Sequence, residues 1–205
     1  MTNWKNTIRK ILLPISLSFF ILIAFVNYSM AAPLVMIKLF GFDLPGRYKV
    51  AGFDLNTSTK VGVGNSFGVE LITSLSPESN VAWGLGIDVP IEHRNLKDIS
   101  GEFYFVPLYG LFKFHFMSGK ISPYVMGKIG FTYLDGNMDF KDTGISNADL
   151  DGGLYYGIGA GIVLNKFHEL ELSHSISHGE VALAGVDYDV KYSKLSLSYK
   201  FLFDY

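Results

Sequence analysis

The chain has 205 residues and a formal charge of −2, with 49% hydrophobic but only 18% charged residues. It contains no cysteine, which excludes a disulfide framework and a thiolate metal site. The slightly acidic balance gives no reason to expect a nucleic-acid partner.

The first 31 residues predict a secretory signal peptide. Basic residues precede an almost unbroken apolar run over residues 11–26, and small residues follow at Ser29 and Ala31. We place cleavage after Ala31, because cleavage one residue later would leave Pro33 next to the cut bond. The alternative is an uncleaved membrane anchor, for which the apolar run is marginal in length.

Residues 32–205 are predicted to form one domain with 14 basic and 19 acidic side chains, a formal charge of −5. Apolar and other side chains alternate over most of this domain, as they do in β-strands. No stretch in it approaches the run of about 18 apolar residues that a membrane helix needs. The alternation predicts eight strands, at residues 34–44, 61–72, 81–92, 103–116, 121–135, 153–164, 167–177 and 195–205.

Short and long connectors alternate between these strands. The short ones are residues 74–80, 117–120 and 165–166, and the longer, more polar ones are 45–60, 93–102, 136–152 and 178–189. Both ends of the domain fall on the side of the short connectors. This arrangement is typical of an outer-membrane barrel with tight periplasmic turns and longer external loops.

The two faces of the strands differ in a way that favours a membrane barrel over a soluble one. A soluble barrel of the lipocalin type would turn its apolar face inward and expose a charged face to water. Here the less apolar face is dominated by glycine, serine and alanine, which fit a cramped lumen. Aromatic residues near the strand ends of the apolar face would form interfacial girdles. These are Trp83, Tyr104, Phe116, Tyr133, Tyr156, Phe203 and Tyr205.

We therefore predict an all-β fold: an eight-stranded antiparallel up-and-down transmembrane β-barrel preceded by a signal peptide. Eight strands enclose an interior just wide enough for side chains, so a large pore is not expected.

The last segment, residues 195–205, has an apolar residue at every second position and an aromatic end. It resembles the C-terminal assembly signal of bacterial outer-membrane proteins, which Tyr199, Phe201, Phe203 and Tyr205 would carry here.

The domain as a whole resembles the OmpA/OmpX-like outer-membrane β-barrel family over residues 34–205. Supporting pieces are Gly-Val-Glu at 68–70, Pro-Tyr-Val at 123–125 and Glu-Leu-Glu-Leu-Ser at 169–173. The resemblance implies a monomer in the outer membrane of a Gram-negative cell, inserted by the barrel-assembly machinery and surrounded by outer-membrane lipid and lipopolysaccharide. We expect no peptidoglycan-binding domain and no wall-anchoring role.

Several charged or titratable side chains fall on the lumen face, and we expect a structural salt-bridge network among them, because unpaired buried charges are costly. Its predicted members are Glu70, Lys113, Lys128, Glu171 and Lys200, with Lys128 and Lys200 as candidate partners of the two glutamates. The other charged or titratable residues on this face are Asp88, Glu92, His115, Glu169 and Lys194. The alternative function for these charges is an ion path through a small channel or porin.

A catalytic alternative rests on the segment Ser173-His174-Ser175-Ile176-Ser177-His178. It resembles lipid A deacylases in placing serine and histidine together on a late strand, but the His-x-Ser spacing of those enzymes is missing. Strict alternation also directs His174 away from the face of Ser173 and Ser175. We therefore predict no catalytic residues, with a lipid A-modifying enzyme as the alternative.

Two smaller patterns carry no predicted function. Residues 147–152 begin like a calcium loop, but the twelfth position is Ile158 rather than glutamate, so no metal or cofactor is expected. The tetrapeptide Gly-Phe-Asp-Leu occurs at 41–44 and again at 52–55, which we interpret as coincidence rather than as an extra β-ribbon. The repeat leaves open whether the first strand ends at residue 44 or extends into 47–55.

The function expected from the sequence is a structural and surface-interaction role in the outer membrane. The barrel would have a filled lumen and four external loops whose ligand the sequence does not specify.

Overall fold

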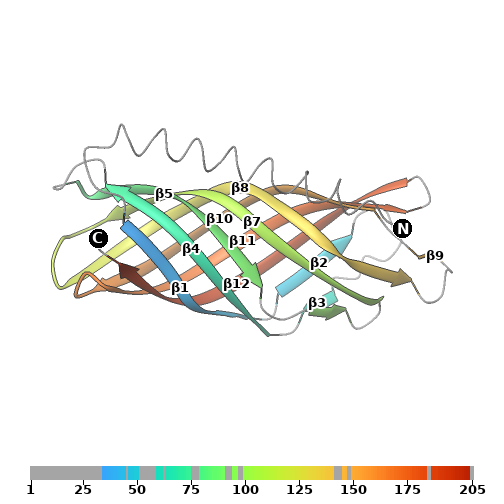
Figure 1. Cartoon of the computed structure of the whole chain (residues 1–205), viewed down its shortest axis with the longest axis horizontal. Coiled ribbons are helices and arrows are strands. Elements are labelled where there is room, and N and C mark those ends of the chain that lie inside the picture. The colour runs from blue at the N-terminus through green and yellow to red at the C-terminus, as the bar shows by residue number, and fades with distance from the viewer. Residues whose placement is uncertain are drawn as a thin grey trace.

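The computed structural model describes residues 34–44, 46–50, 59–61, 63–74, 79–90, 94–96, 99–140, 145–146, 149–183 and 186–203. The predicted signal peptide and Tyr205 lie outside these residues. Eight long strands form the wall (Figure 1): β1 (Leu34–Asp43), β4 (Gly64–Ser74), β5 (Val81–Pro90), β7 (Ile99–His115), β8 (Ile121–Phe140), β10 (Asp149–Leu164), β11 (His168–Leu183) and β12 (Val186–Phe203). Four short strands accompany them: β2 (Gly46–Val50), β3 (Thr59–Val61), β6 (Arg94–Leu96) and β9 (Ile145–Ser146).

The long strands form a closed antiparallel barrel. Each one pairs with the next long strand along the chain, and β1 also pairs with β12. Closure gives every strand of the wall two neighbours, as lipid requires, because lipid offers no hydrogen bonds to a free strand edge. The predicted eight-stranded up-and-down barrel is therefore confirmed. No helix in the part of the chain that the structure describes could cross a membrane.

A β-bulge explains the weak alternation in the first strand. The register of β1 against β12 shifts between Lys38 and Phe40. Lys38 points into the lumen, whereas Leu39 and Phe40 are both about half exposed on the outer face. Two adjacent outward residues are what a bulge produces, since two residues on one strand then oppose one on its partner.

The strands on the long-connector side are longer than predicted. β8 ends only at Phe140, β11 continues to Leu183 and β12 already begins at Val186, so the loop expected at 178–189 is mostly a β-ribbon. Alternation could not indicate this extension, because beyond the bilayer neither face of a strand needs to be apolar. At the right of Figure 1 these ribbons project beyond the barrel wall.

The described residues of the connector predicted at 45–60 form two short strands. Strand β2 pairs with β12 from Val50 opposite Val190 to Arg47 opposite Ser193, and β3 pairs with β2. β1 leaves β12 at Asp43, opposite Ser196, and β2 then covers the β12 edge that would otherwise stay unpaired. An additional ribbon is therefore present. The second copy of the tetrapeptide, at 52–55, lies outside the described residues.

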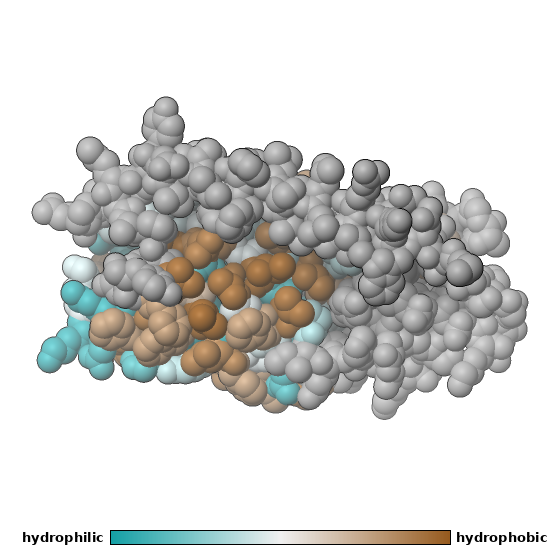
Figure 2. Space-filling model, viewed as in Figure 1, coloured by the Kyte–Doolittle hydropathy of each residue, from teal (hydrophilic) through white to brown (hydrophobic). Residues whose placement is uncertain are grey.

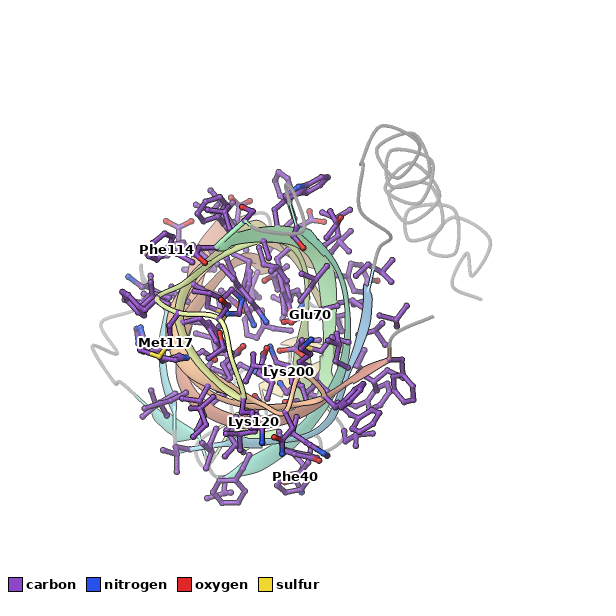
Figure 3. All side chains as sticks on the ribbon, turned by 90° about the vertical axis from the view of Figure 1, so that its left-hand side faces the viewer. Phe40, Glu70, Phe114, Met117, Lys120 and Lys200 are labelled. Atoms are coloured by element: carbon purple, nitrogen blue, oxygen red, sulfur yellow. The ribbon has the colours of Figure 1, made fainter. Side chains whose placement is uncertain are left out.

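The side chains have the orientation of a membrane barrel. On the outer face Phe112 is 53% exposed and Ile158 70%, whereas Lys200 inside is fully buried. Figure 2 shows apolar side chains gathered over the described part of the wall, with polar ones at its left end. In Figure 3 Glu70 and Lys200 lie inside the ring of strands, whereas Phe40 and Phe114 point away from it. A soluble barrel would have the opposite arrangement.

Candidate functional site

The middle of the lumen holds six charged side chains, which we call the central network. It consists of Glu70 on β4, Lys113 on β7, Lys128 on β8, Glu169 and Glu171 on β11, and Lys200 on β12. Each occupies an inward position of its strand, and none is more than 7% exposed. The barrel thus converts single charges, spaced far apart in the sequence, into one buried cluster.

Lys200 has the most partners in this cluster. Its Nζ donates to both carboxylate oxygens of Glu70 at 2.9 Å and also to Glu171, and it lies 3.2 Å from Glu169. Removal of this one ammonium group would therefore leave three carboxylates with fewer partners.

The other two lysines bridge the same carboxylates. Lys128 Nζ lies 3.2 Å from a carboxylate oxygen of Glu70 and 3.2 Å from one of Glu171. Lys113 donates to both oxygens of Glu169 at 2.8 and 2.9 Å and lies 3.6 Å from Glu70. Three ammonium groups thus neutralise three carboxylates. Such pairing is what makes buried charge tolerable.

Two tyrosines complete the network. Tyr109 donates its hydroxyl to Glu70 at 3.0 Å, and Tyr124 donates to Glu171 at 3.2 Å. Their rings also lie under the lysines, with Lys128 Nζ 4.7 Å from the Tyr109 centroid and Lys113 Nζ 4.9 Å from that of Tyr124. Cation–π contacts of this kind add to the stabilisation of the buried cations.

The structure brings all five predicted network residues together. The prediction placed Glu169 on the lumen face but did not name it among the five network residues, although its separation of two from Glu171 places both on one face of β11. Of the other lumen candidates, Asp88 pairs with Lys38 and Lys194 with Asp43. His115 makes a 2.9 Å contact through Nδ1 with the Ser122 hydroxyl. Glu92 lies outside the described residues.

Towards the long connectors the lumen becomes apolar. The rings of Phe105 and Tyr192 stack at 5.5 Å, and Leu134, Val181 and Val190 are each buried around them. The described part of the lumen is thus filled by side chains at two levels, one charged and one apolar.

The carboxylates of Glu70, Glu169 and Glu171 come within 4.8 Å of one another, as ligands of a cation would. The three lysine ammonium groups already occupy hydrogen-bonding positions on these oxygens. The cluster therefore fits an internal salt-bridge network better than a metal site.

Neighbouring serine and histidine side chains of the segment 173–178 point to opposite faces of β11, as alternation predicts. Ser175 is buried in the lumen, whereas His174 is exposed on the outer face. His174 Nε2 instead contacts the hydroxyl of Ser193, on the neighbouring strand β12, at 2.9 Å. Sequence reasoning missed this pair, because only the strand register brings the two residues together. The ring of His178 stacks on Tyr156 at 5.8 Å.

Three residues of the predicted assembly signal, Tyr199, Phe201 and Phe203, lie on the outer face near the short turns, and the fourth, Tyr205, lies outside the described residues. The Phe201 ring contacts those of Phe203 at 4.8 Å and His168 at 5.3 Å. The hydroxyl of Tyr199 lies 2.7 Å from His168 Nδ1. The wall thus carries an aromatic cluster at this end, where amphipathic rings favour the membrane interface.

Glycine at position 86 makes room for Tyr109. A Cβ built on Gly86 would lie 2.6 Å from the Tyr109 ring, whereas one on the outward-facing Gly127 would meet nothing within 4 Å. We expect Gly86→Ala to lower the free energy of unfolding by about 1–3 kcal/mol through overpacking. Gly127→Ala should leave it unchanged within about 0.5 kcal/mol. Urea unfolding of both variants in lipid vesicles would check this, and equal effects would contradict it.

Closed topology, an apolar outer wall and a charged, filled lumen together define an outer-membrane β-barrel. The chain belongs to the outer membrane protein beta-barrel domain family, whose model matches residues 20–201. The predicted class and its location in the outer membrane are thereby confirmed.

Solved structures agree with this fold. The outer membrane protein OprG from Pseudomonas aeruginosa is 15% identical, with a TM-score of 0.54 over 86% of this chain and 98% of that one. Neisserial surface protein A is 10% identical, with a TM-score of 0.52 over 83% of this chain and 97% of that one. At these identities the likeness concerns the fold alone. A search of curated proteins found no match.

Proposed function

We propose that this chain is a monomeric barrel with a structural and surface-interaction role, whose lumen does not conduct. The central network carries the proposal, because its three lysines and three glutamates neutralise one another where an ion would have to pass. An ion entering this level would have to break several short contacts between buried charges. The apolar layer around Phe105 and Tyr192 adds a second barrier.

The long strands support the surface-interaction part of the proposal. A transmembrane β-strand needs about 9–11 residues. β4 and β5 have 11 and 10 residues, but β8 has 20 and β12 has 18. About half of each longer strand is therefore left to form ribbons outside the membrane, which could present a surface to partners.

Planar-bilayer recording tests the closed lumen. We expect the purified wild-type protein to give no steady open conductance above that of the empty bilayer. A lasting open level would favour the small-channel alternative. In cells, deletion of the gene should raise the uptake of an apolar fluorescent dye, and unchanged uptake would count against a structural role.

A second candidate, an acyl-chain hydrolase, is favoured by the contact between His174 and Ser193. A histidine within hydrogen-bonding distance of a serine hydroxyl can activate it as a nucleophile. The pair lies on the outer wall, which lipid would reach. Mass spectrometry of lipopolysaccharide incubated with the protein tests this candidate. Acyl release that is lost in both His174→Ala and Ser193→Ala would establish it over the non-catalytic role, and no release would exclude it.

A further inference from the structure

The short-turn end of the lumen contains a pocket that the central network does not fill. Its volume is about 330 Å³, at the lower end of the range for small-molecule sites. Its rim comes from the three short connectors: Ser79 and Asn80, residues 117–119, and Lys166 with Phe167. Figure 3 looks at the barrel from this end and labels Met117 on the rim.

The wall of the pocket is mostly apolar. Met36, Ile72, Ala82 and Leu202 converge on it from β1, β4, β5 and β12. Three of these residues are buried and belong to one hydrophobic cluster, against which Leu202 packs. Such a wall suits an alkyl chain better than a sugar or a nucleotide, because apolar atoms make up most of its surface.

The inner end of the pocket is closed. Lys113 and Glu169 line it and pair at 2.8 Å, and the rest of the central network lies behind them. A molecule that enters from the short-turn side must therefore leave by the same route. The geometry suits a binding site rather than a passage.

The charged residues that line the pocket indicate whether its ligand is an anion or a cation. Among the described lining residues Lys113 and Lys166 carry positive charge and Glu169 negative charge, and Glu169 already pairs with Lys113 and Lys200. Lys166 is exposed at the rim, on the tight turn where Asn165 and Lys166 have φ values of 50° and 68°. An apolar pocket with an ammonium group at its mouth is complementary to an alkyl chain that ends in an anion.

We propose that this pocket binds a small anionic amphiphile of the medium-chain fatty acid class from the short-turn side. The alkyl chain lies against Met36, Ile72 and Leu202, and the carboxylate lies near Lys166. The site is distinct from the central network and requires no conduction through the barrel.

Isothermal titration calorimetry with octanoate tests the proposal on the full protein in lipid nanodiscs, with empty nanodiscs of the same lipid as the blank. We expect saturable binding, and loss of at least about tenfold in affinity in Ala82→Phe, whose ring fills the pocket. Heats that match the empty nanodiscs, or binding that Ala82→Phe leaves intact, would overturn the site. Heat-modifiable gel migration shows which variants have folded.

Two turn variants test the charge and stay informative if Ala82→Phe does not fold. Lys166→Gln should weaken octanoate binding about threefold to fivefold and leave octanol binding unchanged. Lys120→Gln is the matched control, because Lys120 is an exposed lysine of a neighbouring short turn that does not line the pocket (Figure 3). Equal losses for octanoate and octanol, or tighter binding of octyltrimethylammonium than of octanoate, would overturn the anionic assignment.

Discussion

Lys200→Met is expected to lower the free energy of unfolding by about 3–5 kcal/mol, as the loss of one partner does in a buried ion pair. The Lys200 ammonium contacts Glu70, Glu169 and Glu171, and all three carboxylates are buried. Methionine keeps much of the side-chain volume but leaves three carboxylates to two lysines. Urea unfolding in lipid vesicles, followed by tryptophan fluorescence, would measure the change.

Two further variants separate loss of charge balance from loss of packing. Lys120→Met removes an exposed lysine and should change the free energy of unfolding by less than about 0.5 kcal/mol. Adding Glu70→Gln to Lys200→Met restores neutrality and should recover part of the lost stability. A double variant that is less stable than Lys200→Met alone would contradict the account of the central network.

Ile158→Arg is expected to lower the free energy of unfolding by about 2–4 kcal/mol, the cost of arginine on the lipid face near the bilayer centre. Ile158 is 70% exposed on the outer wall, so the substitution creates neither a clash nor a cavity. In water such an exposed position would tolerate arginine. The penalty therefore comes from lipid, and the same urea titration measures it.

The matched control for this variant is Ser118→Arg. Ser118 is exposed on the short connector between β7 and β8, outside the strands. Arginine there should change the free energy of unfolding by less than about 0.5 kcal/mol. If Ile158→Arg were equally harmless, the outer wall would not be lined by lipid.

Alternation was sufficient to predict the wall of the barrel, because the bilayer requires an apolar outer face. It correctly placed Phe112 and Ile158 outside, and Glu70 and Lys200 inside. Outside the bilayer, where no apolar outer face is required, alternation did not predict the strands. The ribbon of β2 and β3 and the extensions of β11 and β12 lie where neither face must be apolar.

Which lumen residues meet could be predicted only in part. In the strand register Glu70 aligns with Met36, and Met36 with Leu202, so Lys200 lies one inward position away from the row of Glu70. Its contact with Glu70 therefore depends on the tilt and stagger of the strands. The alternation of side chains along a strand does not determine its tilt or its stagger. The contact between His174 and Ser193 was missed for the same reason.

Spin labelling tests most directly whether lipid covers the outer wall. Because the chain has no cysteine, Ile158→Cys and Ser118→Cys each provide a single labelling site. In vesicles, molecular oxygen should relax the label at position 158 strongly and a water-soluble nickel complex only weakly, whereas the nickel complex should dominate at position 118. Equal nickel accessibility at the two positions would contradict the assignment of the apolar face to the membrane.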